Sequence, residues 1–207
     1  MTVIQESQKT QTALRDFGRW LLQSGGLPAY KTEDLLTKSR ALHCRSGETV
    51  FSAGDTLEEL FFVNSGLVRY YYLTPEGKEY NKNFVSSDSV VTSLSSFLEA
   101  KPAPFFTEAL EDTVLVAVPI ELARNLASDD IDWERLVGRF VRALAIQKEQ
   151  REASFLLKNA EQRYEAFLKD FSALAMRLPQ YHIASYLGIT PVALSRIRSR
   201  LACRRVS

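Results

Sequence analysis

Histidine and cysteine are scarce in this chain of 207 residues, which holds only His43, His182, Cys44 and Cys203. These four are too few and too scattered for a local zinc site, a disulfide framework or a four-cysteine iron–sulfur cluster. A metal-dependent oxygenase on a β-barrel needs two or three neighbouring histidines and a carboxylate, and only His43 lies near a candidate barrel. The Ser-His-Asp, P-loop and Gly-x-Gly-x-x-Gly patterns are also missing. The sequence therefore predicts a protein that is not an enzyme, with no metal and no cofactor.

Long apolar runs are missing as well. The longest, Val114–Val118, is far shorter than the roughly 20 residues that a membrane-spanning helix needs. The N-terminus shows no basic segment followed by an apolar core, which is the mark of a secretion signal. With no disulfide framework either, the sequence predicts a cytoplasmic protein that does not contact a membrane.

The net charge of +1 hides an uneven distribution of charged residues. The first 170 residues carry 20 basic and 25 acidic side chains, a balance of −5. Residues 171–207 carry six arginines and no acid, which gives +6. A basic segment at the end of a near-neutral chain favours a polyanionic partner for that end.

Turn residues and short β-rich runs fill the region between Gly47 and Pro119. The runs predicted as strands are Glu48–Phe51, Leu60–Asn64, Leu67–Thr74, Lys78–Val85, Phe105–Leu110 and Thr113–Val118. Short, evenly spaced strands with glycine turns are typical of a small antiparallel barrel or jelly roll. The 45 residues before it read as helical, with Leu14, Phe17 and Leu21 at helical spacing. We expect an α+β protein whose residues 1–128 form a β-roll domain with N-terminal helices.

A long helix is predicted over residues 129–158. Its apolar face holds Leu136, Val137, Phe140 and Leu144, and this face is too long for a small roll to cover. Such a helix often runs along a partner helix, so these four residues are the predicted dimer contacts. A helix within the core of one chain is the alternative reading.

The most specific pattern lies in the predicted C-terminal domain, residues 159–207. Ile183-Ala-Ser-Tyr-Leu-Gly-Ile-Thr-Pro-Val-Ala-Leu-Ser-Arg-Ile-Arg198 reads as a helix, a turn at Gly188 and a second helix capped by Thr190. Leu194, Ile197 and Leu201 recur with helical spacing and face inward, which leaves arginine and serine outward. This is the helix-turn-helix pattern, whose second helix enters the DNA major groove.

These stretches resemble the Crp/Fnr family of transcriptional regulators over nearly the whole chain. Besides the helix-turn-helix, the segments on which the resemblance rests are Gly47-Glu-Thr-Val-Phe-Ser-Ala-Gly-Asp55 and Leu60-Phe-Phe-Val-Asn-Ser-Gly-Leu-Val-Arg69. The resemblance implies a cyclic-nucleotide-binding-like roll and a homodimer on a palindromic double-stranded operator, with RNA polymerase as a further partner. A ligand-sensing interaction protein without specific DNA binding is the alternative function.

The region that should hold a cyclic nucleotide departs from the family pattern. Relatives that bind these nucleotides carry a Gly-Glu pair and an arginine there, whereas residues 85–110 contain neither glycine nor arginine. We therefore expect no control by cyclic AMP. The hydroxyls of Thr92, Ser93, Ser95 and Ser96 are candidates for a pocket that takes a less anionic effector. A short capped helix over the roll explains them equally well.

The predicted DNA contacts lie on the second helix of the motif and just beyond it. Arg196 is the candidate for reading a guanine, and Val192 and Ala193 offer only apolar contact with thymine. Arg198, Arg204 and Arg205 are expected on phosphates. The full predicted interface is Thr190, Val192, Ala193, Ser195, Arg196, Arg198, Ser199, Arg200, Arg204 and Arg205.

Overall fold

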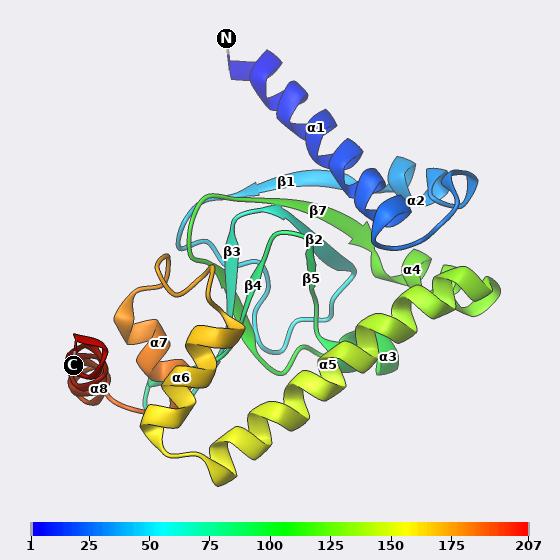
Figure 1. The fold of residues 1–207 in the computed structure, drawn as a ribbon. Helices are drawn as coiled ribbons and strands as arrows, with labels where there is room; N and C mark the ends of the chain where they lie inside the picture. The colour runs from blue at the N-terminus through cyan, green and yellow to red at the C-terminus, as the bar shows by residue number, and fades with distance from the viewer. Residues whose placement is uncertain (1, 207) are drawn as a thin grey trace. The chain divides into compact units, whose positions relative to one another are not determined.

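Seven short strands form two antiparallel sheets in the computed structural model, which describes the backbone of residues 2–206 and the side chains of residues 10–204 (Figure 1). One sheet has the order β1-β7-β2-β5 and the other the order β4-β3-β6. The strands are β1 (Arg40–Cys44), β2 (Glu59–Ser65), β3 (Leu67–Leu73), β4 (Glu79–Ser86), β5 (Ser89–Val91), β6 (Phe106–Ala109) and β7 (Thr113–Pro119). The predicted antiparallel roll is confirmed.

Helices precede and follow the roll, and one, α3, lies between its strands β5 and β6. They are α1 (Thr2–Gln23), the 3₁₀ turn η1 (Ala29–Lys31), α2 (Glu33–Lys38), α3 (Leu94–Glu99), α4 (Ile120–Asp129), α5 (Ile131–Leu157), α6 (Ala160–Asp170), α7 (Gln180–Leu187) and α8 (Pro191–Val206). The long helix and the two helices of the C-terminal motif occur where the sequence predicts them. No helix in the described part of the chain is long and apolar enough to cross a membrane.

The chain divides into two units. The first comprises Met1–Tyr71 and Phe84–Arg142, and the second comprises Tyr72–Asn83 and Ala143–Ser207. The second unit therefore takes in the tip of the β3–β4 hairpin together with the C-terminal half of α5. The division predicted at residues 128 and 158 follows the elements along the chain and stays a prediction.

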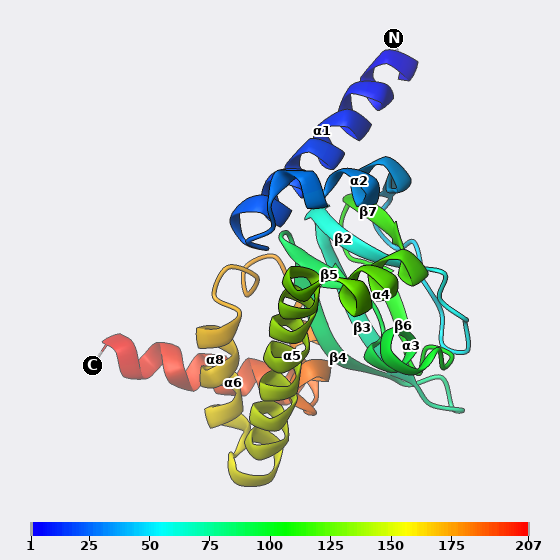
Figure 2. The ribbon, with the colours of Figure 1, turned by 90° about the vertical axis from the view of Figure 1, so that its right-hand side faces the viewer.

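The four-stranded sheet of the first unit carries apolar side chains on both faces. Phe62 and Val116 pack on one face with Phe17 and Leu21 of α1, while Phe61 and Leu115 belong to a separate core cluster. Because successive residues of a strand point to opposite faces, an unbroken apolar run such as Val114–Val118 serves both clusters. Figures 1 and 2 show the C-terminal half of α1 beside β1 and β7.

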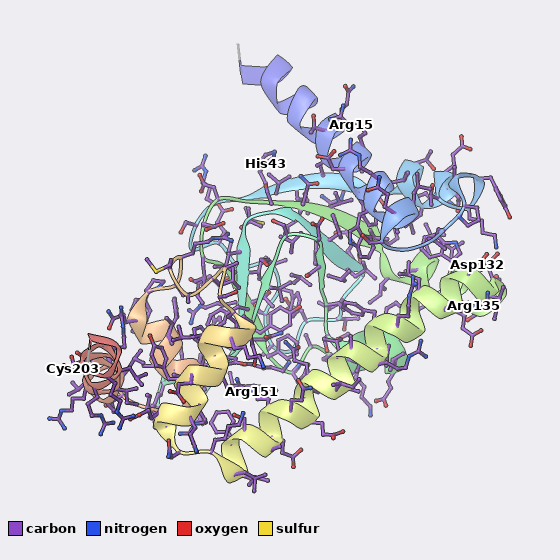
Figure 3. The ribbon with its side chains drawn as sticks, in the orientation of Figure 1. Arg15, His43, Asp132, Arg135, Arg151 and Cys203 are labelled. Atoms are coloured by element: carbon purple, nitrogen blue, oxygen red, sulfur yellow. The ribbon has the colours of Figure 1, made fainter. Side chains whose placement is uncertain are left out.

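The start of α5 is fixed by a capping carboxylate and a lysine. Asp130 Oδ1 accepts hydrogen bonds from the backbone N–H groups of Asp132 (2.9 Å) and Trp133 (3.4 Å). Lys31 Nζ lies 2.6 Å from Asp130 and 2.7 Å from Asp132, and the hydrogen bond from Lys31 lowers the pKa of Asp130. Figure 3 shows Asp132 and Arg135 at this end of the helix. Residues about 100 positions apart thus hold η1 against α5.

Two local predictions differ from the structure, and two elements were not predicted. Arg40–Cys44 was expected to be helical and instead forms β1, which pairs with β7 along five residues. Glu48–Phe51 was expected as a strand; it is not a regular strand, but it lies along β6, with an isolated bridge between Thr49 and Glu108 and backbone hydrogen bonds from Ala109 to Glu48 (2.9 Å) and from Thr107 to Phe51 (3.0 Å). The helix α4, directly after Pro119, and the three-residue strand β5 were not anticipated. Pairing with β7 explains the first difference, because a tertiary partner outweighs weak local helix propensity.

Candidate nucleic-acid interface

The C-terminal motif folds as a helix-turn-helix. Gly188 ends α7 with φ +68°, in the left-handed region that glycine favours, and a Cβ there would lie 3.0 Å from the ring of Phe155. Thr190 then starts α8 by accepting a hydrogen bond at its Oγ1 from the backbone N–H of Ala193 at 3.2 Å. The turn predicted at Gly188 and the helix cap predicted at Thr190 are therefore both confirmed.

One face of α8 is buried against α7. Leu194 is fully buried and Ile197 is 3% exposed, and α7, which α8 contacts, buries Ile183, Ala184 and Leu187. A helix anchored in this way along one side presents its other side to the surroundings at a fixed rotation about its axis. That rotation decides which side chains reach a groove of DNA.

The opposite face of α8 carries most of the predicted interface. Exposed residues there are Thr190, Val192, Ser195, Arg196, Arg198, Ser199, Arg200 and Arg204, whereas Ala193 is half-buried. Within the described part of the chain, Arg196 and Arg198 form no salt bridge, so both guanidinium groups are available to a partner. The hydroxyl of Ser199 already donates a hydrogen bond to the backbone carbonyl of Ser195 at 3.1 Å, so its proton is not available to a partner. The side chain of Arg205 lies outside the described residues.

Two of the predicted contacts have an acidic partner that the sequence did not reveal. Glu161 of α6 accepts from Arg204 Nη1 at 2.6 Å and lies 3.3 Å from Arg200 Nη2. Both arginines are largely exposed, with 61% and 68% of the side-chain surface accessible for Arg200 and Arg204. Such an exposed pair contributes at most about 1 kcal/mol to stability. Its larger effect is electrostatic, because one carboxylate holds two cations that would otherwise be free for phosphate.

Asn81, at the tip of the β3–β4 hairpin, fastens α7. Its buried side-chain amide donates to the carbonyl oxygen of His182 at 3.0 Å and lies 3.1 Å from Nδ1 of the same ring. Its backbone N–H donates to Ser185 Oγ at 2.9 Å. An amide nitrogen can only donate, so the contact with Nδ1 is a hydrogen bond in the tautomer that carries the ring proton on Nε2. His182 is therefore structural.

Arg151 of α5 completes this attachment. Its Nη2 donates to the backbone carbonyls of Asn81 (3.1 Å) and Tyr186 (3.0 Å), and its guanidinium lies 3.8 Å from the centre of the Tyr186 ring. Figure 3 labels Arg151 in this unit, together with Cys203 on α8. Arg163 of α6 adds a hydrogen bond to the carbonyl of Leu187 at 3.2 Å. The hairpin, α5 and α6 thus all hold the helix-turn-helix in position.

Lys82 lies in the same hairpin tip. Burial lowers its pKa to about 8, and the positive charges of Lys148 and Arg151 act in the same direction. A half-buried ammonium beside two other cations raises the free energy of the folded protein at neutral pH.

The four hydroxyls predicted for an effector pocket, those of Thr92, Ser93, Ser95 and Ser96, do not share one environment. Ser93 caps α3 by accepting from the backbone N–H of Ser96, and its Oγ lies 3.0 Å from that of Ser95. The hydroxyls of Thr92 and Ser96 are buried and have no hydrogen-bond partner among the described residues. Of the four, only Thr92 belongs to the lining of an apolar cavity of about 90 Å³, which α1, α3 and α5 also line. Lys101, the single cation of residues 85–110, is exposed and lies 2.7 Å from Glu99.

The predicted dimer contacts are half-buried within their own chain. Leu136 and Val137 pack against the core that includes Phe17 and Phe62, and Phe140 lines the same cavity as Thr92. Leu144 is half-buried too. Further along α5, Ile146 is 56% exposed and Leu157 is 82% exposed, with the exposed Ala143 and Ala153 on the same helical face.

Within the described residues there is no group of three or more His, Cys, Asp and Glu side chains that could hold a metal ion.

Comparison with known proteins agrees with this architecture. Residues 41–130 match a family model described as a cyclic nucleotide-binding domain. The chain is 31% identical over 182 residues to the transcriptional activator protein FnrA of Stutzerimonas stutzeri, covering 81% of this chain and 72% of that protein. It is 25% identical over 179 residues to the electron transport regulator A of Shewanella oneidensis, covering 81% and 70% of the two chains.

A solved structure supports the fold. FixK2 from Bradyrhizobium japonicum superposes with a TM-score of 0.72 at 22% identity, covering 80% of this chain and 85% of that one. At that identity the likeness speaks for the fold alone, and the relatedness to FnrA adds the family. The roll, the long helix and the helix-turn-helix, together with these relatives, show that the chain belongs to the Crp/Fnr family of transcriptional regulators.

Proposed function

We propose that this protein is a homodimeric regulator that binds a palindromic operator through α8 and does not respond to cyclic AMP. The observation that carries the proposal is the division of α8 into two faces. Leu194 and Ile197 anchor it, and Ser195, Arg196 and Arg198 are exposed. A helix with this division fits the major groove, where an arginine can donate two hydrogen bonds to guanine.

Within this interface Arg196 is the base reader and Arg198 binds phosphate. Arg196 stands between the two buried anchors, about a turn and a half from the cap at Thr190, so its side chain projects into the groove when the helix docks. Arg204 and Arg200 bind phosphate only after they leave Glu161, which makes their contribution conditional. RNA polymerase is a further partner in this proposal.

The dimer forms along α5. The stripe of Ala143, Ile146, Ala153 and Leu157 is exposed in the single chain and repeats at helical spacing, which suits a helix–helix contact. Leu136, Val137, Phe140 and Leu144 contribute where the two helices extend towards the roll. Substituting Ile146 with aspartate should dissociate the dimer in sedimentation, while the exposed, charged Glu149 changed to alanine serves as the control.

The absence of cyclic AMP control rests on residues 85–110. Their only cation, Lys101, is paired with Glu99 at the surface, so the segment offers no arginine to neutralise a phosphodiester. Residues 41–130 match a cyclic nucleotide-binding family model because they form the same kind of β-roll, and this match does not depend on an arginine in residues 85–110.

The test is selection of genomic DNA fragments by the purified protein, followed by binding measurements on the selected site and on scrambled DNA. Arg196→Ala should cost about 1–3 kcal/mol per half-site and relax the preference at one base position. Arg198→Ala should weaken both DNAs alike and reduce the salt dependence. Equal loss on both DNAs for Arg196→Ala would move base reading to Ser195 or Arg200. Failure to select any sequence would favour an interaction protein without specific DNA binding.

A further inference from the structure

The tip of the β3–β4 hairpin lies along the C-terminal half of α5, and both belong to the second unit. Two contacts align the strand with the helix. Asn83 Nδ2 donates to Gln147 Oε1 at 3.5 Å, and Arg151 Nη2 donates to the carbonyl oxygen of Asn81 at 3.1 Å. Side chains that lie between these two contacts on either element are therefore brought together.

Three cations occupy this place. Lys82 lies between the two strand residues of these contacts, and Lys148 lies between the two helix residues, with Arg151 about one turn further along α5. The charges of Lys148 and Arg151 both act on the half-buried ammonium group of Lys82. We call Lys82, Lys148 and Arg151 the cation cluster.

Acidic side chains do little to neutralise the cation cluster. Within the described part of the chain, Lys148 and Arg151 form no salt bridge, and the neighbouring acids Glu149 and Glu152 are exposed on α5. The charged groups that shift the pKa of Lys82 are both cations. Holding like charges together at a half-buried position opposes folding, and a bound anion would offset that cost.

Two phenol groups stand beside the cluster. Arg151 acts on Tyr72 of β3 and on Tyr186 of α7, and its guanidinium lies 3.8 Å from the centre of the Tyr186 ring. Burial raises the pKa of both phenols, while the charge of Arg151 opposes the rise, and Asp170 acts on Tyr186 in the same direction as burial. Both phenols therefore keep their proton at neutral pH, and the half-exposed Tyr72 adds a neutral donor.

The composition of this patch selects its ligand. Ammonium and guanidinium groups next to a hydroxyl donor are the groups that bind phosphoryl oxygens. The cluster packs against α7 through Tyr186, whereas the predicted DNA contacts lie on the face of α8 that points away from α7. Because α7 separates the cluster from that face, a small anion fits the observations better than the DNA backbone.

We propose that the cation cluster of Lys82, Lys148 and Arg151 binds the phosphoryl group of a small metabolite. A phosphoryl dianion balances most of the three positive charges and accepts hydrogen bonds from each of them. The phosphodiester of cyclic AMP carries one charge and has no terminal phosphoryl group, so it does not meet this requirement. The proposal concerns binding alone and stands independently of DNA recognition.

The predicted dimer stripe leaves the site open. Lys148 lies on the side of α5 opposite to Ile146 and Leu157, because residues two and nine positions away on a helix point in nearly the reverse direction. A partner helix packed on Ile146 and Leu157 therefore does not cover the cation cluster.

Calorimetric titration of the full chain at low salt, with inorganic phosphate and with sulfate as probes, tests the proposal. Both should bind saturably. Sulfate keeps its two charges near pH 8, where Lys82, with a pKa of about 8, is half protonated. An anion stabilises the ammonium form and raises that pKa, so binding at pH 8 should take up about half a proton per site, and affinity should fall as the pH rises further. Comparing buffers of different ionisation enthalpy measures this uptake.

Lys82→Met and Lys148→Gln should each weaken phosphate binding about tenfold or more, the worth of one charge-assisted hydrogen bond. Lys82→Met should fold, because it removes a half-buried charge that opposes folding, and it should also abolish the proton uptake. Lys78→Met is the matched control. It removes an equal charge from the same hairpin, where the ammonium group of Lys78 lies 4.7 Å from the centre of the Tyr80 ring, and it should change neither quantity.

Three results would overturn the proposal. The first is no saturable heat with phosphate or sulfate in the wild-type protein at low salt. The second is equal weakening in Lys82→Met and Lys78→Met, which would reduce the binding to an effect of overall charge. The third is displacement of phosphate by an equimolar scrambled DNA duplex, which would make the DNA backbone the occupant.

Discussion

Replacing Glu161 with glutamine should strengthen DNA binding. The glutamate holds Arg204 at 2.6 Å and Arg200 at 3.3 Å, and a neutral amide of the same shape releases both guanidinium groups. The pair is exposed on the arginine side, so the unfolding free energy should change by at most about 1 kcal/mol. The released arginines lie on the same helix as Arg196 and Arg198 and become available for phosphate.

The size of the effect follows from counterion release. Each additional phosphate contact steepens the dependence of log K on log salt by about 0.9. If one arginine per subunit gains a contact, a dimer gains two, and the slope increases by about 1.8. Lowering the salt from 200 to 50 mM should then favour the variant by about an extra tenfold over the wild type.

Fluorescence anisotropy on the selected operator and on scrambled DNA, over a salt series, measures this slope. Glu165→Gln is the matched control, because it removes the same charge one turn further along α6 from a residue that forms no salt bridge within the described residues. The gain for Glu161→Gln should be similar on both DNAs, since phosphate contacts carry no sequence information. An unchanged slope, or an equal change in both variants, would refute the reasoning.

The remaining predictions concern stability and ligand choice. Lys82→Met should stabilise the protein by about 2 kcal/mol at pH 7. The pKa of Lys82 falls from 10.5 to about 8 in the folded state, and the partial exposure of the ammonium group makes the penalty smaller than the full shift implies. The wild type loses that proton between pH 8 and 10.5 on folding, so its stability rises there, and thermal melts should show the advantage of the variant shrinking across this window. Gly66→Ala should cost about 3–5 kcal/mol in urea unfolding, because φ is +114° and the new Cβ would lie 2.3 Å from Thr113 Oγ1. Gly77→Ala, at φ +81° with open space around it, should cost only about 1 kcal/mol, and comparable losses in the two would contradict the steric account. Calorimetry with cyclic AMP should show no saturable binding below about 10 μM, near −7 kcal/mol, as the composition of residues 85–110 requires.

Local sequence patterns predicted the parts of this fold that depend on neighbours in the chain. The cap at Thr190, the turn at Gly188 and the inward spacing of Leu194 and Ile197 are short-range features, and the structure has them as expected. The strand Arg40–Cys44 was missed because its partner β7 lies some 70 residues away and leaves no local mark.

The interface shows the same limit. Arg204 was expected on phosphate from its place in the sequence, and only the folded chain reveals Glu161 beside it, 43 residues earlier. Asn81 was likewise unremarkable in a polar hairpin until the fold placed its amide against His182. Long-range polar pairs of this kind leave no periodic pattern in the sequence, so hydrophobic patterning cannot predict them.

The attachment of α7 to the hairpin tip has a consequence for protein engineering. The unit that carries the helix-turn-helix is discontinuous, since it includes Tyr72–Asn83 as well as Ala143–Ser207. A chimera that exchanges DNA-binding regions between relatives by a single crossover near residue 143 would inherit Asn81 from one parent and His182 from the other. Because the amide of Asn81 bonds both the ring and the carbonyl of His182, such a hybrid keeps the junction only if the hairpin tip is exchanged as well.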